Sequence, residues 1–287
     1  MSNLTPHISF FDPSFSESKT AHYHVYLQLS VSSLTYTIFN PVTSTFIGLE
    51  KYLLNDIYND YSMVSPLKDI LAANQLLQKT FKLFHVAYVN ERATLIPSAI
   101  FNKNELAQYH RFNYSAREED VFLADRLLNL DGYNVYSVPD FIKGVFQEQK
   151  NIRFHHFSSA LIEASISEAK KHQLDLLVHV HILPSSFQIM VVKNQLLEIY
   201  NSFSYQTSED FIYYLLFVFN QLAINTSEIS VCLTGEVDKN SAIYDMMQNY
   251  IKTITFGKRP VNLKYSYLFE DVPPHYYYSL FNQYLCE

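Results

Sequence analysis

The chain has 287 residues, 48% hydrophobic and 17% charged, which is long enough for two domains that each bury a core. Its formal net charge of -7 and the lack of a basic cluster argue against nucleic acid as a partner. Only two cysteines are present, Cys232 and Cys286, which excludes a disulfide framework and indicates a reducing compartment. No apolar run is long enough to span a bilayer, so we expect a soluble, cytoplasmic protein.

The first half begins with strands. Residues 1–20 are polar and rich in turn formers, which predicts a loosely held N-terminal arm. Residues 22–30 alternate between apolar and polar side chains, and with residues 34–39 and 45–50 they predict a three-stranded meander. Helices and strands then alternate, with a helix expected to open at Ser65 and Pro66 and another over residues 158–172.

The second half repeats this order. Strands predicted over residues 176–183, 187–192 and 196–200 form another meander. Thr207 and Asp210 have the spacing of a capping box and predict the start of a helix. This helix is apolar on nearly every side, so we expect it to be buried almost all round.

The repeated order predicts an α/β protein that arose by internal duplication. We expect a first domain over residues 21–173 and a second over residues 174–287, after the arm of residues 1–20. Each domain should hold a mixed sheet with a three-stranded meander and flanking helices.

Several short motifs follow one another along nearly the whole chain: TLIPSAIF (residues 94–101), RFN (111–113), HHFSS (155–159), NSFSY (201–205), EDFIYYL (209–215), TGE (234–236) and a final CE. In this order and spacing the chain resembles a bacterial family, domain-of-unknown-function 3822, regarded as actin-like in fold. The resemblance implies duplicated actin-like, ribonuclease H-like domains and brings no established activity. Active members of the wider actin, Hsp70 and sugar-kinase superfamily bind ATP in a cleft between two such domains.

In those active members, a tight Gly-containing turn between the first two strands of each domain holds phosphate, and an Asp just before it holds metal-bound water. In the corresponding first turn of this chain, Gln28 stands where the Asp would be and Ser30 where the Gly would be. Ser32 and Ser33 complete this turn. They are candidate phosphate contacts only through their hydroxyl and amide groups.

The second corresponding turn contains Ser185 and Ser186 and has neither Asp nor Gly, while Pro184 removes one backbone donor. None of the 5 glycines lies in either turn. Gly235 and Glu236, at a strand-to-helix turn, are similar to the superfamily's adenosine-binding segment.

We therefore predict a degenerate nucleotide cleft and a pseudo-ATPase: a non-catalytic binding or scaffold protein with a protein partner, no catalytic residue and no cofactor. The alternative is a residual ATP-binding protein or phosphotransferase. In that case the serine-lined turns would hold phosphate without glycine, since hydroxyls and loop amides can bind phosphate.

Histidines occur in two His-x-His pairs, His22 with His24 and His179 with His181, each in the first strand of a half. Alternate strand positions share a face, so each pair could offer two imidazoles to a metal. Two ligands are too few for a zinc site, and no nearby Cys or carboxylate completes either set. We therefore predict no metal. The sequence also lacks a recognisable nucleophile motif.

Overall fold

The computed structural model describes residues 4–286, and these residues form two compact units. Unit 1 contains the chain up to Ala160 together with Pro260–Asp271 and the segment from Leu280. Unit 2 contains Leu161–Arg259 and Val272–Ser279. The division falls inside a helix rather than at the predicted boundary between residues 173 and 174, and the two units share the C-terminal region.

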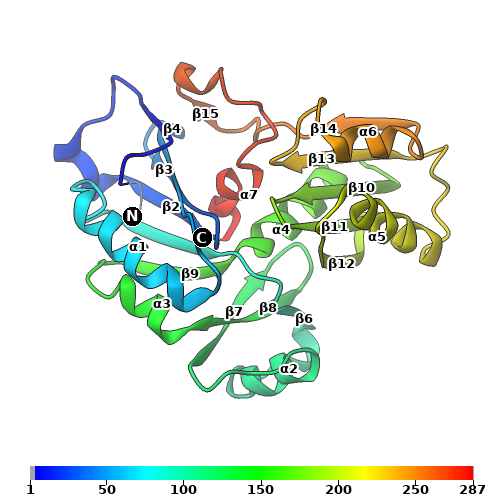
Figure 1. Cartoon of the computed structure of the whole chain (residues 1–287), viewed down its shortest axis with the longest axis horizontal. Helices are drawn as coiled ribbons and strands as arrows, with labels where there is room; N and C mark the ends of the chain where they lie inside the picture. The colour runs from blue at the N-terminus through cyan, green and yellow to red at the C-terminus, as the bar shows by residue number, and fades with distance from the viewer. Residues whose placement is uncertain (1–3, 287) are drawn as a thin grey trace. The chain divides into compact units, whose positions relative to one another are not determined.

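The main sheet of unit 1 has seven strands in the order β1-β4-β3-β2-β5-β9, with β15 paired to β4 (Figure 1). The strands are β1 (Ile8–Phe11), β2 (His24–Leu29), β3 (Ser33–Asn40), β4 (Thr45–Leu53), β5 (Leu83–Tyr88), β9 (Ile152–His156) and β15 (Lys264–Tyr265). β2, β3 and β4 form the expected antiparallel meander, while β5 and β9 add parallel strands. All but the last residue of β3 are buried, because both faces of the sheet are covered.

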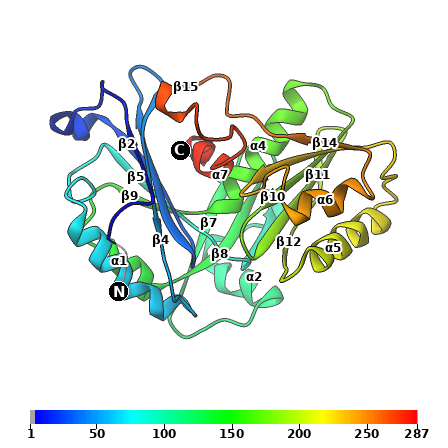
Figure 2. The ribbon, with the colours of Figure 1, turned by 45° about the horizontal axis from the view of Figure 1, so that its top comes forward.

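Helices α1 (Asp60–Ala73) and α3 (Asp140–Val145) cover one face of this sheet, which Figure 2 shows nearly edge-on. The C-terminal segment covers the other face. There the Phe281 ring lies 4.9 Å from the Phe46 ring and 5.3 Å from the Tyr265 ring. Gln283 Nε2 donates a hydrogen bond to Leu27 O. These contacts explain why the end of the chain belongs to unit 1.

Residues 8–11 differ from the loosely held arm that the sequence predicted for residues 1–20. They form β1, which pairs antiparallel with β4 from Ile8 opposite Lys51 to Phe11 opposite Gly48. A Cβ at Gly48 would lie 3.0 Å from the Phe11 ring, so the small residue makes room for this packing. Residues 1–3 of the predicted arm lie outside the described residues.

Unit 1 also holds a three-stranded antiparallel sheet in the order β6-β8-β7. Its strands are β6 (Ala93–Pro97), β7 (Asp120–Leu127) and β8 (Gly132–Pro139), with α2 (Leu106–Asn113) against one face. Tyr136 and Val138 of β8 join the apolar core of the main sheet. The small sheet is thereby anchored to the rest of unit 1.

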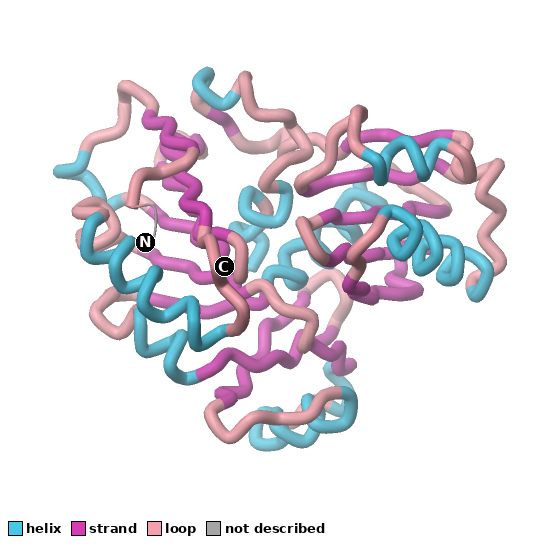
Figure 3. Tube along the Cα trace, viewed as in Figure 1, coloured by secondary structure: helices cyan, strands magenta, loops and turns pink. Residues whose placement is uncertain are grey.

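Unit 2 has a five-stranded sheet in the order β12-β11-β10-β13-β14. Its strands are β10 (Leu176–Ile182), β11 (Ser186–Lys193), β12 (Leu196–Ser204), β13 (Ser230–Gly235) and β14 (Thr253–Phe256). Helices α5 (Ser208–Gln221) and α6 (Ala242–Gln248) pack beside each other on this sheet (Figure 3). Part of α4 (Phe157–Lys171) and of the short α7 (Tyr278–Phe281) also belongs to unit 2.

The strand order β4-β3-β2-β5-β9 of unit 1 corresponds to β12-β11-β10-β13-β14 of unit 2. In both, three antiparallel strands are followed by two parallel additions. The predicted mixed α/β architecture with a meander in each half is confirmed. Internal duplication stays a prediction that this shared order supports. No helix within residues 4–286 is both long and apolar enough to cross a membrane.

Local sequence signals set the helix starts. The predicted capping box of α5 is confirmed, since the Thr207 side chain accepts from Asp210 N and the Asp210 side chain accepts from Thr207 N. α1 starts earlier than the expected opening at Ser65 and Pro66. Asn59 caps it in a reciprocal arrangement with Ser62, and Pro66 lies inside the helix.

The expectation that α5 is buried almost all round is wrong. Phe211, Leu215 and Phe219 are buried against the sheet, but the Tyr213 side chain is 64% exposed and that of Phe217 48%. The sheet and α6 together cover only part of the helix circumference. An apolar side of α5 is therefore left facing solvent.

A chain of hydrogen bonds fixes the second histidine pair inside unit 2. Ser165 Oγ donates to Leu161 O at 2.7 Å and lies 2.7 Å from His179 Nδ1, so His179 Nδ1 carries the proton. Thr234 Oγ1 lies 2.7 Å from His179 Nε2 and 2.9 Å from His181 Nδ1. Thr234 thus donates to His179 and accepts from His181.

Burial lowers the pKa of His179 to about 3, and burial together with the neighbouring His179 lowers the pKa of His181 to about 3, so both rings are neutral near pH 7. A metal at His179 would have to displace hydrogen bonds from both of its ring nitrogens. Within residues 4–286 no three His, Cys, Asp or Glu side chains are grouped to hold a metal ion.

These two histidines predict acid destabilisation. Above the ordinary pKa of 6.5 both histidines are neutral in the folded and in the unfolded chain, so they do not oppose folding. As the pH falls towards about 3, the unfolded chain binds protons at these positions and the folded chain does not, so the stability of the folded state is lost. Each histidine should cost about 1.4 kcal/mol of unfolding free energy per pH unit below 6.5. Urea unfolding at pH 7.5 and 5.5 measures this cost. The double variant His179→Gln, His181→Gln should show a smaller pH dependence, and the exposed-site control His22→Gln should behave as wild type; equal pH dependence in all three would contradict the assignment.

Candidate functional site

The first predicted turn joins β2 to β3 and is closed on itself. Ser30 Oγ accepts from the backbone N–H of Ser33 at 3.0 Å and of Ser32 at 3.3 Å. Ser30 N also donates to Ser33 O at 2.9 Å. The structure thus brings the three serines together, but the amides that a phosphate would need already bind a hydroxyl of the same turn.

Gln28 lies on β2, two residues before Ser30, and is half-buried opposite Thr35 and Ala87 in the sheet. Its side chain can donate and accept hydrogen bonds but carries no charge. The arrangement therefore supplies amide and hydroxyl groups beside the first turn and no carboxylate at this position.

The second predicted turn, between β10 and β11, is tied to Tyr205. Tyr205 OH donates to Leu183 O at 2.6 Å, and Tyr205 N donates to Ser185 O at 3.0 Å. Leu183 N donates to Ser186 O at 2.9 Å. Pro184 has no N–H, so few backbone donors of this turn remain for an anion. The resemblance motif at residues 201–205 thus has a structural role.

Gly235 ends β13 where that strand lies parallel to β10. Its φ is +88°, and a Cβ would lie 2.1 Å from Ile182 O, so no other residue fits without moving the backbone. Gly235 N donates to His275 O at 2.9 Å, and Glu236 N donates to Ile182 O at 2.8 Å. The exposed Glu236 lies at the same end of the sheet as the turn containing Ser185.

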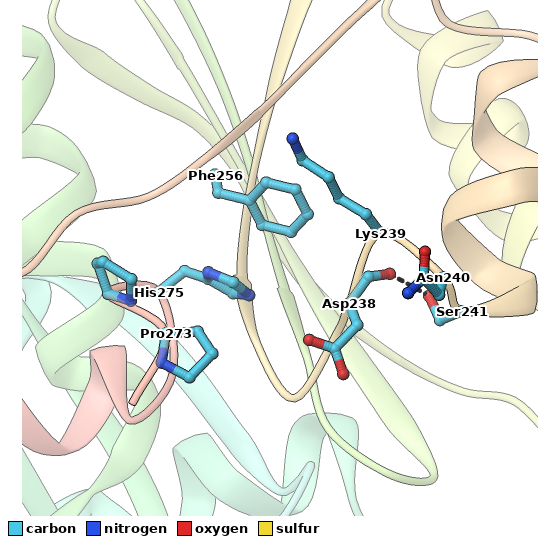
Figure 4. Close-up of a pocket in the computed structure, with 8 residues that line it drawn as sticks. Asp238, Lys239, Asn240, Ser241, Phe256, Pro273 and His275 are labelled. Carbon is cyan, nitrogen blue, oxygen red and sulfur yellow. Dashed lines mark hydrogen bonds between the residues drawn. The ribbon is translucent and has the colours of Figure 1, made fainter. Parts of the chain in front are cut away.

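A pocket of about 590 Å³ lies beside this loop and was missed by the sequence reasoning (Figure 4). Its lining comes from the loop after β13, from β14 and from the C-terminal region: Asp238, Lys239, Asn240, Ser241, Phe256, Pro273, Pro274 and His275. The Phe256 and His275 rings lie 4.3 Å apart and give it an aromatic wall. The Asp238 carboxylate and the Lys239 amine point to different sides.

His275 holds the rim of this pocket in place. Its Nε2 donates to Val237 O at 2.7 Å, while Tyr276 OH donates to Asp238 at 2.9 Å. Burial lowers the pKa of His275, which keeps the ring neutral near pH 7. Such a pocket can accept a planar group against Phe256. No spacing signal links residues 238–241 with positions 256 and 275, so the sequence could not predict it.

The HHFSS motif forms a buried polar cluster in unit 1. Asp125 accepts hydrogen bonds from Ser159 Oγ at 2.6 Å, His156 N at 2.8 Å, His155 Nδ1 at 3.1 Å and Tyr136 OH at 3.2 Å. These bonds join β9 and the start of α4 to β7 and β8. The cluster fixes the small sheet against the main one.

Ser158 and His156 have a spacing found in nucleophilic catalysis, with Ser158 Oγ 2.6 Å from His156 Nδ1. Both side chains are buried, however, and Ser158 Oγ also accepts from Asn134 Nδ2 at 2.9 Å. His156 Nε2 lies 3.1 Å from Asn90 O, and burial lowers the pKa of His156 to about 4. This arrangement gives a substrate no access and acts as a structural link.

Comparisons with known proteins identify the fold. A protein from Bacteroides thetaiotaomicron with an actin-like ATPase fold and unknown function aligns with a TM-score of 0.75 at 19% identity, covering 85% of this chain and 93% of its own. A chain of the PilM-PilN type IV pilus biogenesis complex aligns with a TM-score of 0.57 at 10% identity, covering 92% of this chain and 98% of its own. Identities this low establish fold similarity alone. No curated protein matches this chain.

The model of a family described as "Protein of unknown function (DUF3822)" matches residues 12–254. This match includes every internal motif from TLIPSAIF to TGE, which confirms the resemblance seen in the sequence. The chain therefore belongs to the DUF3822 family of proteins of unknown function and has an actin-like ATPase fold.

Proposed function

We propose that this protein is a non-catalytic binding or scaffold protein in which the nucleotide-binding turns of an actin-like fold are degenerate. The observation that carries this proposal is the closed first turn, where Ser30 Oγ occupies the amides of Ser32 and Ser33. A phosphate would have to compete with a hydroxyl held in the same turn. That competition weakens any phosphate site here.

The residues present do not fit ATP with its magnesium ion. Hard cations prefer oxygen ligands and gain most from carboxylates, and Gln28 offers only a neutral amide. In the second turn Pro184 lacks an N–H, while Leu183 O and Ser185 O are held by Tyr205. Both turns are therefore poorly suited to hold ATP and magnesium for phosphoryl transfer.

A protein is the partner that we propose. The PilM-PilN structure is a complex of two proteins and offers a precedent for protein binding by a chain of similar fold. Cys232 and Cys286 are thiols and not halves of a disulfide, which supports a reducing, cytoplasmic location. Burial raises the pKa of Cys232 to about 11, so this thiol is a poor nucleophile.

Weak nucleotide binding is the second candidate, because one observation favours it. The pocket beside Gly235 has an aromatic wall formed by Phe256 and His275, which suits a planar ring. Without phosphate contacts from the turns, such a ring would contribute most of the affinity. This candidate therefore predicts binding without turnover.

We expect ATP turnover at the buffer background and a dissociation constant on the order of millimolar or weaker, the scale of about 4 kcal/mol. Isothermal titration and phosphate release with magnesium measure both quantities. The double variant Gln28→Asp, Ser30→Gly frees two amides and restores a carboxylate, so it should bind ATP more tightly than wild type. Ser227→Gly, in an exposed loop of unit 2, is the matched control. Phosphate release from ATP by the wild type above the rate in buffer without protein would refute the proposal.

Partner binding should not depend on nucleotide. A tagged full-length chain purified from native extract should retain the same partner protein under two conditions: with added ATP and magnesium, and after enzymatic removal of nucleotides. The molar ratio of partner to tagged chain should be the same in both. Quantitative mass spectrometry measures this ratio. The same ratio is measured for the double variant Gln28→Asp, Ser30→Gly as a comparison. A partner released on ATP removal from the wild type would instead support the nucleotide-binding alternative.

A further inference from the structure

A second pocket, of about 370 Å³, lies at the end of unit 2 that is away from Gly235. β10 meets Gly235 at Ile182, whereas the pocket is lined by Leu176 at the start of the same strand. A volume near the lower limit of about 300–1,000 Å³ for ligand sites suits a small molecule. The rest of the lining comes from the end of β11, the start of β12 and the loop between α5 and β13: Val191, Lys193, Glu198, Leu222, Ala223, Ile224, Asn225, Glu228 and Ile229.

A β-bulge in β12 places one carboxylate in this lining. Val191 pairs with Ile199 and Val192 pairs with Leu197, so one residue of β12, Glu198, is extra. Ile199 packs against the core on the α5 side of the sheet. Because side chains alternate along a regular strand, regular pairing would put Glu198 on the opposite side from Ile199. With the bulge, Glu198 lines the same pocket as Val191.

Apolar side chains form most of the remaining lining. Val191 and Ile229 are buried, and Leu222 and Ile224 are partly buried where they pack against the core of unit 2. Leu176, at the start of β10, is still 38% exposed. The pocket therefore offers apolar contacts that a ligand with a hydrocarbon side chain could cover.

Three exposed charged side chains, Lys193, Glu198 and Glu228, line the same pocket. Within residues 4–286 none of the three forms an ion pair or a side-chain hydrogen bond. Asn225 Oδ1 accepts from Ser227 N at 3.1 Å and from Ser227 Oγ at 2.9 Å, which leaves its Nδ2 as a donor. The lining thus supplies an ammonium group and an amide for an anion, and two carboxylates for a cation.

The carboxyl end of α5 adds to the attraction for a cation. The helix ends at Gln221, and the residues that follow it line the pocket. Its last turn contains no basic residue. Since the carboxyl end of a helix carries a partial negative charge, it favours a positive group nearby.

We propose that this pocket binds a free α-amino acid with a branched apolar side chain, such as leucine. Glu198 and Glu228 bind its ammonium group, Lys193 binds its carboxylate, and its side chain covers Leu222 and Ile224. An amine without a carboxylate would leave Lys193 unmatched, and a carboxylate without an amine would face two like charges. The residues of this site differ from those of the two turns and of the pocket beside Gly235, so the inference goes beyond the proposed function.

Isothermal titration of the full-length chain with L-leucine tests this site. Leucine should bind, and 3-methylbutylamine, which lacks the carboxylate, should bind at least about tenfold more weakly. The same loss is expected for 4-methylpentanoate, which lacks the ammonium group. Glycine keeps both charges but has no apolar side chain, so it should also bind at least about tenfold more weakly than leucine.

Lys193→Met and Lys171→Met form a matched pair, because both lysines belong to unit 2 and are exposed, and only Lys193 lines the pocket. Lys193→Met should lose the preference for leucine over 3-methylbutylamine, whereas Lys171→Met should keep it. The double variant Glu198→Gln, Glu228→Gln should lose the preference for leucine over 4-methylpentanoate. A misfolded variant would bind none of the three compounds, so these changes in preference report on the site itself.

Three results would each overturn the proposal. The first is no binding of leucine to the wild type at concentrations up to about 10 mM, beyond the millimolar end of the affinity scale. The second is binding of the amine or of the carboxylate analogue as tight as that of leucine. The third is an equal effect of Lys193→Met and Lys171→Met on leucine binding.

Discussion

The backbone contact between Gly235 and Ile182 sets the geometry of one end of unit 2. A Cβ at Gly235 would lie 2.1 Å from Ile182 O, so the two strands approach this closely only because position 235 has no side chain. The approach lets Glu236 N bond to Ile182 O and turns the chain towards α6. It also presents Gly235 N to His275 O, and His275 then forms a wall of the adjoining pocket.

Buried polar groups determine the rest of the architecture. Asp125 accepts four hydrogen bonds in unit 1, and Thr234 links two neutral histidines in unit 2. In surroundings this rich in aromatic rings, each unpaired donor or acceptor would cost about 1–3 kcal/mol. The sheets and helices that carry these groups are therefore held in one relative arrangement within each unit.

Periodicity was sufficient to predict most of the fold. Alternation identified both meanders, and the Thr207 capping box located α5, because these signals lie within a few residues of one another. Contacts between distant residues were not predictable in the same way. The pairing of β1 with β4, the return of residues from Leu280 to unit 1, and the meeting of Phe256 with His275 all depend on chain paths that local spacing does not encode. The assignment of Gly235 to an adenosine-binding segment stays a prediction, whereas the structure shows that this position allows the close approach of two strands.

The candidate turns lack features that a small anionic ligand needs, and α5 has features that a protein partner needs. In the first turn the Ser30 hydroxyl accepts hydrogen bonds from two backbone N–H groups that an anion would use, and in the second turn Pro184 has no N–H. On α5, apolar surface that the fold could have buried stays exposed at Tyr213 and Phe217. Binding a compact anion depends on available N–H groups, whereas binding a protein depends on apolar and aromatic anchors that exclude water. Both features therefore support the protein partner that we propose.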